Sequence, residues 1–333
     1  MRETTWHAAS KGRIEEIASA VLGPGYGAAI EFSVAAPSPS NIRVYAKQAE
    51  YRRYLKKNFP SPVMDAPWLT FYYCTEGAQV FAACGHDPRA ENTPSMGLYD
   101  WETGTGIIYG PSEYGLVKST AVGLHTRLVF EQGWNPIHGA VAQVDGSGVL
   151  IIGHHGAGKS TALLNVIRFA RGRFQVRVLT DDWAVARKKE GDLSIQAIEP
   201  RMAVSSQLVA ENPHLDLAPQ YFAAKDEAID KAWIHVDDVW PGQHCESAVI
   251  RKIFVFSHAM PGTVQPADRA HVAEIIVESA YHMPDEDTKI VGKMREFWAS
   301  SLSSVSCWEI NNRHDGRSIE EIYYPILNLL TGT

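Results

Sequence analysis

Residues 148–161 read Gly148-Val-Leu-Ile-Ile-Gly153-His-His-Gly-Ala-Gly158-Lys159-Ser160-Thr161, an apolar run that passes into a glycine-rich loop. The apolar run is rich in β-branched residues and suits a strand covered on both faces. The residues that follow, Thr161-Ala-Leu-Leu-Asn-Val-Ile-Arg-Phe-Ala170, have the apolar spacing of a helix that begins at about Lys159. The loop itself fits G-x-x-x-x-G-K-[ST], a pattern that is specific when a strand precedes it and a helix follows. The sequence therefore predicts a phosphate-binding loop, and an ordinary glycine-rich strand-to-helix turn is the alternative.

The residue types of this loop match what a bound polyphosphate requires. Glycines allow backbone N–H groups to turn inward around the phosphates, at a helix N-terminus that already favours anions. Lys159 adds a mobile cation, and Ser160 would offer its hydroxyl to Mg²⁺, which prefers hard oxygen ligands. We therefore expect ATP and Mg²⁺ as cofactors. The predicted nucleotide contacts are Gly153, Gly156, Ala157, Gly158, Lys159, Ser160 and Thr161.

A pair of carboxylates follows the next predicted strand. Residues 176–180 have the pattern of a buried strand, and Asp181-Asp182 come directly after it, beginning 22 residues beyond Lys159. This position suits a metal ligand or a base opposite the phosphate loop, whereas a solvated strand end is the alternative. Successive strand side chains point to opposite faces, so the two aspartates have different roles unless the strand ends or bulges between them. One carboxylate could therefore act as a base while the other holds Mg²⁺, and Asp181 would be the metal ligand if Asp182 is the base.

Composition excludes several classes of protein. The chain has 333 residues and 45% hydrophobic content, enough for a substantial core and for two domains. Its net charge of −7, with basic residues spread along the chain, predicts neither nucleic acid nor membrane partners. No apolar run approaches the roughly 20 residues that span a bilayer, and the polar start lacks a signal-peptide core, so a cytoplasmic location is expected. The four cysteines show no C-x-x-C spacing and are expected to be reduced.

The texture of the chain changes near residue 130. Residues 1–130 are expected to form a strand-rich N-terminal domain of unknown role, which ends in a helix over 114–130. Residues 131–333 are expected to form the nucleotide-binding domain. It opens with two apolar strands that meet at an Asp-Gly turn, Asp145-Gly146, and lead directly into the phosphate loop. A homo-oligomer is compatible with the sequence, which leaves the oligomeric state open.

Three segments in order, Ile137-His138-Gly139, the phosphate loop and Leu179-Thr-Asp181-Asp182, resemble the catalytic domain of HPr kinase/phosphorylase. That bacterial family phosphorylates a serine of a protein, and its fold resembles the nucleotide-binding core of phosphoenolpyruvate carboxykinase. The resemblance covers roughly residues 135–200. It implies an α/β (α+β) fold with a phosphate-loop core, to which the strand-rich N-terminal domain is added.

The resemblance also implies roles for individual residues. His138 matches the family's active-site histidine, Lys159 its phosphate-binding lysine, Ser160 its Mg²⁺ hydroxyl and Asp182 its proton acceptor. Glu199, in Glu199-Pro-Arg201, matches a further Mg²⁺ carboxylate. His138 packed at a domain junction is the alternative for that residue.

The sequence also departs from the family. Thr161 stands where the family commonly has Glu, the segment between the loop helix and the aspartates is longer here, and no Pro-Gly-Arg-Asn-like stretch tied to dephosphorylation is present. Phosphorylase activity and HPr as the substrate are therefore not expected.

Three functions are compatible with these residues. The first is a Mg²⁺-dependent kinase that transfers the γ-phosphoryl group of ATP to an alcohol, because phosphoryl transfer needs mainly positioning and charge stabilisation. Relatives of the family act on serines of proteins, on precursor peptides and on free serine, so the acceptor is a hydroxyl of a peptide, protein or small molecule. The second is a nucleotide-binding switch or ATPase that acts on a partner protein. The third is a carboxykinase-like enzyme, although no further cation-rich motif marks a substrate site for it.

Overall fold

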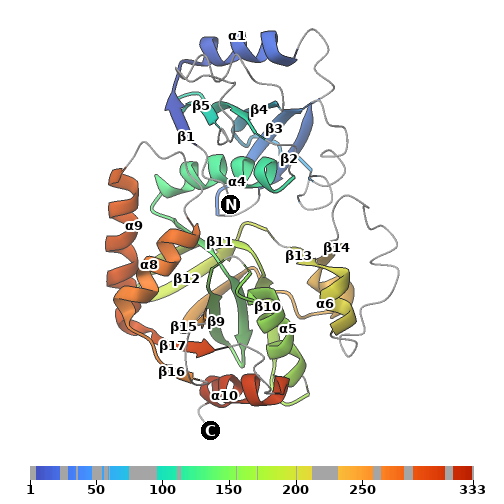
Figure 1. Cartoon of the computed structure of the whole chain (residues 1–333), viewed down its shortest axis with the longest axis vertical. Helices are drawn as coiled ribbons and strands as arrows, with labels where there is room; N and C mark the ends of the chain where they lie inside the picture. The colour runs from blue at the N-terminus through green and yellow to red at the C-terminus, as the bar shows by residue number, and fades with distance from the viewer. Residues whose placement is uncertain are drawn as a thin grey trace, which may run out of the picture. The chain divides into compact units, whose positions relative to one another are not determined.

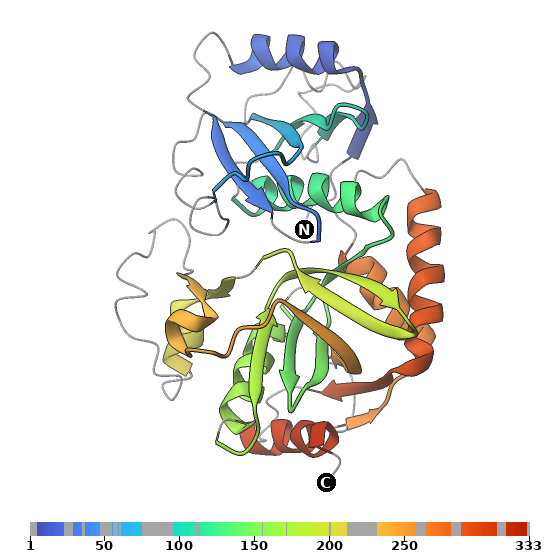
Figure 2. The same ribbon diagram turned by 180° about the vertical axis from the view of Figure 1, so that it is seen from behind.

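The computed structural model describes residues 5–22, 29–34, 37–46, 55, 59, 61–74, 96–110, 114–154, 156–170, 172–199, 201–211, 232–257, 264–280, 288–311 and 318–331. The chain divides into two compact units (Figures 1 and 2). The first comprises residues 1–132 together with 282–290, and the second comprises 133–281 together with 291–333.

The first unit is built on a mixed six-stranded sheet. Three of its strands, β3, β4 and β6, run parallel to one another. β2 is antiparallel to β3, β5 is antiparallel to β6, and β1 runs parallel to β5. The order across the sheet is β1 (Thr5–Ala8), β5 (Met96–Asp100), β6 (Thr105–Tyr109), β4 (Trp68–Cys74), β3 (Ser40–Ala46) and β2 (Ile30–Val34). The strand-rich texture expected for this part of the chain is therefore present.

Helices cover both faces of this sheet. Helix α1 (Lys11–Leu22) packs its apolar side, which includes Ile14, Ile17 and Leu22, against side chains of β4, β5 and β6. Helix α4 (Tyr114–Phe130) contacts β3 and β4 and lies on the opposite face from α1 (Figure 1). The helix that the sequence predicts over 114–130 is thus confirmed.

The second unit contains the larger, nine-stranded sheet. Its main path runs β10 (Val176–Thr180), β8 (Ala140–Val144), β9 (Ser147–Ile152), β15 (Ser247–Ser257), β12 (Asp192–Ala197), β11 (Trp183–Lys189) and β7 (Asn135–His138). β17 (Ser306–Asn311) pairs with β15, and β16 (Val264–Pro266) pairs with β17. A separate two-stranded sheet is formed by β13 (Arg201–Val204) and β14 (Ala232–His235).

Two chain segments pass from one half of this sheet to the other at the same place. β7 continues into β8 through Gly139, and β10 continues into β11 through Asp181 and Asp182. β8 pairs with β10 and β7 pairs with β11, and the Gly139 N–H donates to the Asp182 carbonyl oxygen at 2.8 Å. Gly139 is required here because a Cβ atom on it would lie 2.8 Å from the Ile151 carbonyl oxygen. The aspartate pair therefore occupies a kink where the strand is interrupted.

The hairpin before the phosphate loop forms as the sequence predicts. β8 and β9 pair antiparallel, and Asp145 and Gly146 between them both have positive φ, at 49° and 77°, as a two-residue hairpin turn of this kind requires. β9 then leads into the loop, and helix α5 (Lys159–Ala170) begins at the predicted residue.

The core of the second unit lies between the sheet and two helices. Helix α5 packs beside α10 (Ile319–Thr331) against β8, β9, β10 and β15, and apolar residues of α6 (Ser206–Glu211), β13, β14 and α7 (Val236–Val239) extend this core. Helix α8 (Arg269–Ala280) packs against β7, and α9 (Thr288–Ser301) continues through the turn η3 (Leu302–Ser304) into β17.

In the part of the chain that the structure describes, no helix has the length and apolar character to cross a membrane. The fold class is therefore mixed α/β with several sheets, of the α+β kind.

Candidate active site

The loop between β9 and α5 depends on its glycines for its backbone conformation. Gly156 and Gly158 have φ of +79° and +84°, values that side chains other than glycine rarely adopt. A Cβ atom on Gly153 would lie 2.7 Å from the Phe256 carbonyl oxygen, so this glycine allows the loop to approach β15. Ala157 is buried, and its N–H donates to the His154 carbonyl oxygen at 3.1 Å, which closes the loop into a tight turn.

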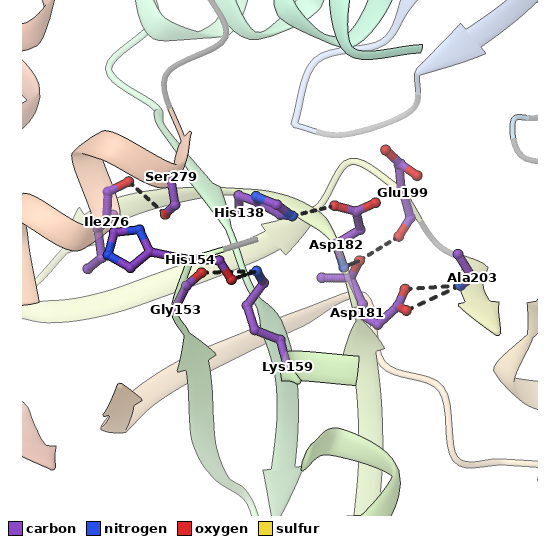
Figure 3. Close-up of polar contacts among 11 residues, drawn as sticks. His138, Gly153, His154, Lys159, Asp181, Asp182, Glu199, Ala203, Ile276 and Ser279 are labelled. Carbon is purple, nitrogen blue, oxygen red and sulfur yellow. Dashed lines mark hydrogen bonds and ion pairs between the residues drawn. The ribbon is translucent and has the colours of Figure 1, made fainter. Parts of the chain in front are cut away.

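The Lys159 side chain folds back onto the backbone of this turn. Its side chain is only 8% exposed, and its ammonium donates to the carbonyl oxygens of Gly153 and His154 at 3.0 and 3.3 Å (Figure 3). Burial lowers the pKa of Lys159, and the nearby carboxylates of Asp182 and Asp181 oppose that shift by favouring the charged form. The loop cation and the acidic pair, distant in sequence, therefore lie within electrostatic range of each other.

Ser160 and Thr161 occupy the first turn of α5. Both are partly buried, and the first backbone hydrogen bond of the helix runs from the Ala162 N–H to the Gly158 carbonyl at 2.8 Å. The backbone N–H groups at this helix start have no intrahelical acceptor, and helix N-termini in general favour negative charge. Ser160 therefore stands where a hydroxyl could reach a cation held by phosphates.

Asp182 is paired with the predicted active-site histidine. The Nε2 atom of His138 lies 2.9 Å from Oδ1 of Asp182, and both side chains are largely but not fully buried, with 13% and 20% exposure. The contact follows from the strand crossing, because β7 ends at His138 and β11 begins directly after Asp182. Figure 3 shows the pair beside the Lys159 ammonium. The three residues assigned to catalysis from sequence are thus brought together.

Asp181 faces a different partner. It is 4% exposed, and its two carboxylate oxygens lie 3.3 and 3.2 Å from the N–H of Ala203 in β13. Hydrogen bonds of this type stabilise the charged carboxylate. The strand interruption at the kink lets both aspartates stay at the same end of the sheet while their side chains diverge.

Glu199 is only partly in keeping with its predicted role. Its backbone carbonyl accepts a 2.8 Å hydrogen bond from the Thr180 hydroxyl, so the chain at Glu199 does lie beside the end of β10. The Glu199 side chain is buried, however, and Figure 3 shows its carboxylate directed away from Lys159. The backbone of Glu199 therefore lies near Asp181 and Asp182, whereas its carboxylate points away from Lys159.

Two residues that organise the site were missed from sequence. The Thr180 hydroxyl, besides its bond to Glu199, accepts the N–H of Asp182 at 3.3 Å and so holds the kink. Trp183 stacks on His138 with ring centroids 5.1 Å apart and an interplanar angle of 8°. The only sequence signal for either is adjacency to Asp181-Asp182, and a hydroxyl or an aromatic ring at a strand end usually has a packing role.

Other comparisons add no further assignment. No protein-family model matches the sequence, and a search of curated proteins found no significant relative. Across the described ranges, no three His, Cys, Asp or Glu side chains gather as a metal centre would require. Mg²⁺ bound with a nucleotide needs fewer protein ligands, since phosphates and waters complete its shell.

Proposed function

We propose that this chain is a Mg²⁺-dependent kinase with an HPr kinase-like phosphate-loop core, and that it transfers the γ-phosphoryl group of ATP to an alcohol. The observation that supports this most is the His138–Asp182 pair, a hydrogen-bonded carboxylate within electrostatic range of the Lys159 ammonium. Phosphoryl transfer to a hydroxyl mainly requires a cation that binds the phosphates and a base for the acceptor, and Lys159 and Asp182 are the candidates for these two roles.

The loop would hold the nucleotide through its backbone. Polyphosphate oxygens would accept N–H groups of the turn between Gly153 and Lys159 and of the first turn of α5. The Lys159 ammonium now donates to two backbone carbonyls of the loop. Phosphate oxygens would replace those carbonyls as stronger, charged acceptors. Ser160 and Asp181 would hold Mg²⁺, which neutralises charge on the phosphates when bound.

The acidic pair and the histidine would act on the acceptor. Asp182 takes the proton of the attacking hydroxyl while the new bond between oxygen and γ-phosphorus forms, and the bond from that phosphorus to the β–γ bridging oxygen breaks, leaving ADP. His138 donates from Nε2 to Asp182 and so fixes the direction of its carboxylate. The Lys159 ammonium would stabilise the negative charge that develops on the transferred group and on the leaving oxygen.

The acceptor class is a hydroxyl, most simply that of serine in a peptide, in a small protein or as the free amino acid. The test is a transfer screen with [γ-³²P]ATP and Mg²⁺, in which free L-serine and a library of seryl peptides are the probes. We expect label on an acceptor with the wild-type chain and none with Lys159→Met.

The same screen separates the kinase from its alternative. Lys159-dependent release of inorganic phosphate, with no label on any hydroxyl probe, would assign the chain to the ATPases and contradict the kinase proposal. The position of Asp182 favours transfer, because a base that is hydrogen-bonded by His138 and lies at the loop suits deprotonation of an acceptor.

A further inference from the structure

Trp183 has no role in the chemistry proposed above, yet its side chain contacts His138, which does. Trp183 and His138 are opposite each other in the antiparallel ladder of β11 and β7. Side chains at directly opposed positions lie on the same face of a sheet and contact each other. The two rings are nearly parallel, at 8°, with centroids 5.1 Å apart, which is the offset arrangement that aromatic rings prefer.

The indole is itself held firmly. Trp183 is 4% exposed, and its carbonyl oxygen accepts the N–H groups of both Ile198 and Glu199, at 2.9 and 3.2 Å. On the other side of the residue, the Asp182 carbonyl oxygen accepts the Gly139 N–H at 2.8 Å, so the backbone before and after the indole is hydrogen-bonded. A side chain with so little room cannot leave its rotamer without disturbing β11.

We infer that Trp183 is a positioning residue for the proposed phosphoryl transfer, which holds the His138 imidazole so that its Nε2 stays on Asp182. An imidazole at a strand end has two side-chain torsions that can rotate, and only one orientation gives the 2.9 Å contact with Oδ1 of Asp182. The flat indole face removes the competing orientations. This inference rests on the proposed function for its catalytic part, whereas the stack itself can be tested without any reaction.

The kinetic test compares two substitutions of Trp183. Trp183→Phe keeps a flat ring, and Trp183→Leu keeps apolar bulk without one. We expect Trp183→Leu to lower kcat for transfer to the probe labelled in the screen by about tenfold, with the KM for ATP unchanged because the loop is not touched. Trp183→Phe should stay within about threefold of wild type. Trp240→Leu, another buried tryptophan of the same unit, is the matched control for loss of core volume and should leave kcat unchanged.

A double-mutant cycle separates positioning from a general structural effect. In a His138→Ala background, Trp183→Leu should lower kcat no further, because the ring that it positions is gone. Additive losses would overturn the inference, as would a Trp183→Leu variant with wild-type kcat, or a folded Trp183→Phe variant that loses as much as Trp183→Leu.

Chemical modification provides a readout that does not depend on catalysis. Diethyl pyrocarbonate modifies accessible imidazoles, and peptide mass spectrometry can follow His138 relative to the exposed His154. Trp183→Leu should speed modification of His138 severalfold relative to His154, whereas Trp183→Phe should leave the rate unchanged. If Trp183→Leu fails to fold, the folded Trp183→Phe variant still tests the stack, because fast modification of His138 in it would contradict the inference. An unchanged rate in Trp183→Leu would overturn the inference. Absence of transfer by the wild-type chain to every probe would instead overturn the proposed function, while this arm still decides whether the stack holds the imidazole.

Discussion

Asp181 and Asp182 are adjacent in sequence but bind different groups: Asp181 accepts the backbone N–H of Ala203, whereas Asp182 lies 2.9 Å from His138 Nε2. The two carboxylates diverge because the chain kinks between β10 and β11. Both nevertheless favour the charged form of Lys159. The pair thus joins a buried structural contact to the proposed chemistry, and substitutions should separate the two roles.

Asp182→Asn should lower phosphoryl transfer by the ~10²–10⁴ typical of the loss of a general base, with little change in Mg·ATP affinity or melting temperature. Asp181→Asn should raise the Mg²⁺ requirement and weaken nucleotide binding, because it removes the carboxylate assigned to the metal. The measurements are Mg²⁺ titrations of nucleotide binding and of transfer on both variants. Full transfer by Asp182→Asn would remove the proton acceptor and the main reason to prefer a kinase over a nucleotide-binding switch.

Asp181→Ala tests the structural contact separately. It leaves the Ala203 N–H without its acceptor, and we expect a loss of about 1–3 kcal/mol in the free energy of unfolding. Urea denaturation followed by circular dichroism measures this loss. Glu278→Ala, at an exposed carboxylate of α8 in the same unit, is the control.

His138→Ala should lower transfer by a smaller factor than Asp182→Asn, because the histidine acts through the carboxylate. The substitution removes the hydrogen bond that directs Asp182 and leaves the phosphate loop untouched. Steady-state transfer and thermal melting are measured on the same preparation. Unchanged turnover with a lower melting temperature would assign His138 to the packing of the strand crossing.

Lys159→Met should abolish transfer without lowering the melting temperature. Burial lowers the pKa of Lys159, so the folded state disfavours the ammonium relative to the unfolded chain. That cost is fully present below the folded-state pKa and disappears as the pH rises toward the unfolded value. Methionine removes it. Transfer and melting at neutral pH are measured against Lys189→Met, at an exposed lysine of β11. Retention of more than about a tenth of wild-type transfer, ~1.4 kcal/mol of barrier, would contradict the loop assignment.

Gly153→Ala should weaken both stability and nucleotide binding. The added Cβ would meet the Phe256 carbonyl oxygen at 2.7 Å and the Ala157 side chain at 3.0 Å, so the loop or β15 must shift. Overpacking of this kind costs about 1–3 kcal/mol. The control is Gly292→Ala in α9, where nothing lies within 4 Å and a gain of about 0.5–1 kcal/mol is expected. Urea denaturation and fluorescent-ATP titration measure the two effects, and an unaltered Gly153→Ala variant would show that the close approach to β15 is not needed.

Cys245 and Cys307 should react slowly with iodoacetamide in the folded chain. Both are free thiols, and burial raises the pKa of each to about 11. The reactive thiolate is therefore scarce at neutral pH, and its fraction rises with pH toward that value. Peptide mass spectrometry compares alkylation of the two sites at pH 8 in native and urea-unfolded protein. Equal rates in the two states would contradict the burial that the structure gives these thiols.

The loop, its strand and its helix were predictable because each depends on residues close in sequence. Glycine spacing, an apolar β-branched run and helical periodicity specify local backbone with little help from the rest of the chain. The Asp145-Gly146 hairpin and the helix over 114–130 follow for the same reason.

The partners of the site residues could not be read in the same way. Contacts such as His138 with Asp182 and Trp183, or Asp181 with Ala203, depend on strand register and on a kink between β10 and β11, which no local pattern encodes. Glu199 is an example of a contact that the sequence did not indicate. The family resemblance assigns its carboxylate to Mg²⁺, whereas in the structure its backbone carbonyl accepts the Thr180 hydroxyl and its side chain is buried.

The strand crossing at Gly139 makes the hydrogen-bonded path from β8 through β9, β15, β12 and β11 to β7 return to its starting point in the chain. The loop that carries Lys159 and the strand end that carries His138 are thus linked twice, once through Gly139 and once around the whole circuit. Strand pairings around this circuit constrain the separation of the two segments from both sides. The separation between the Lys159 ammonium and the His138 ring is therefore set by backbone pairing around the closed circuit.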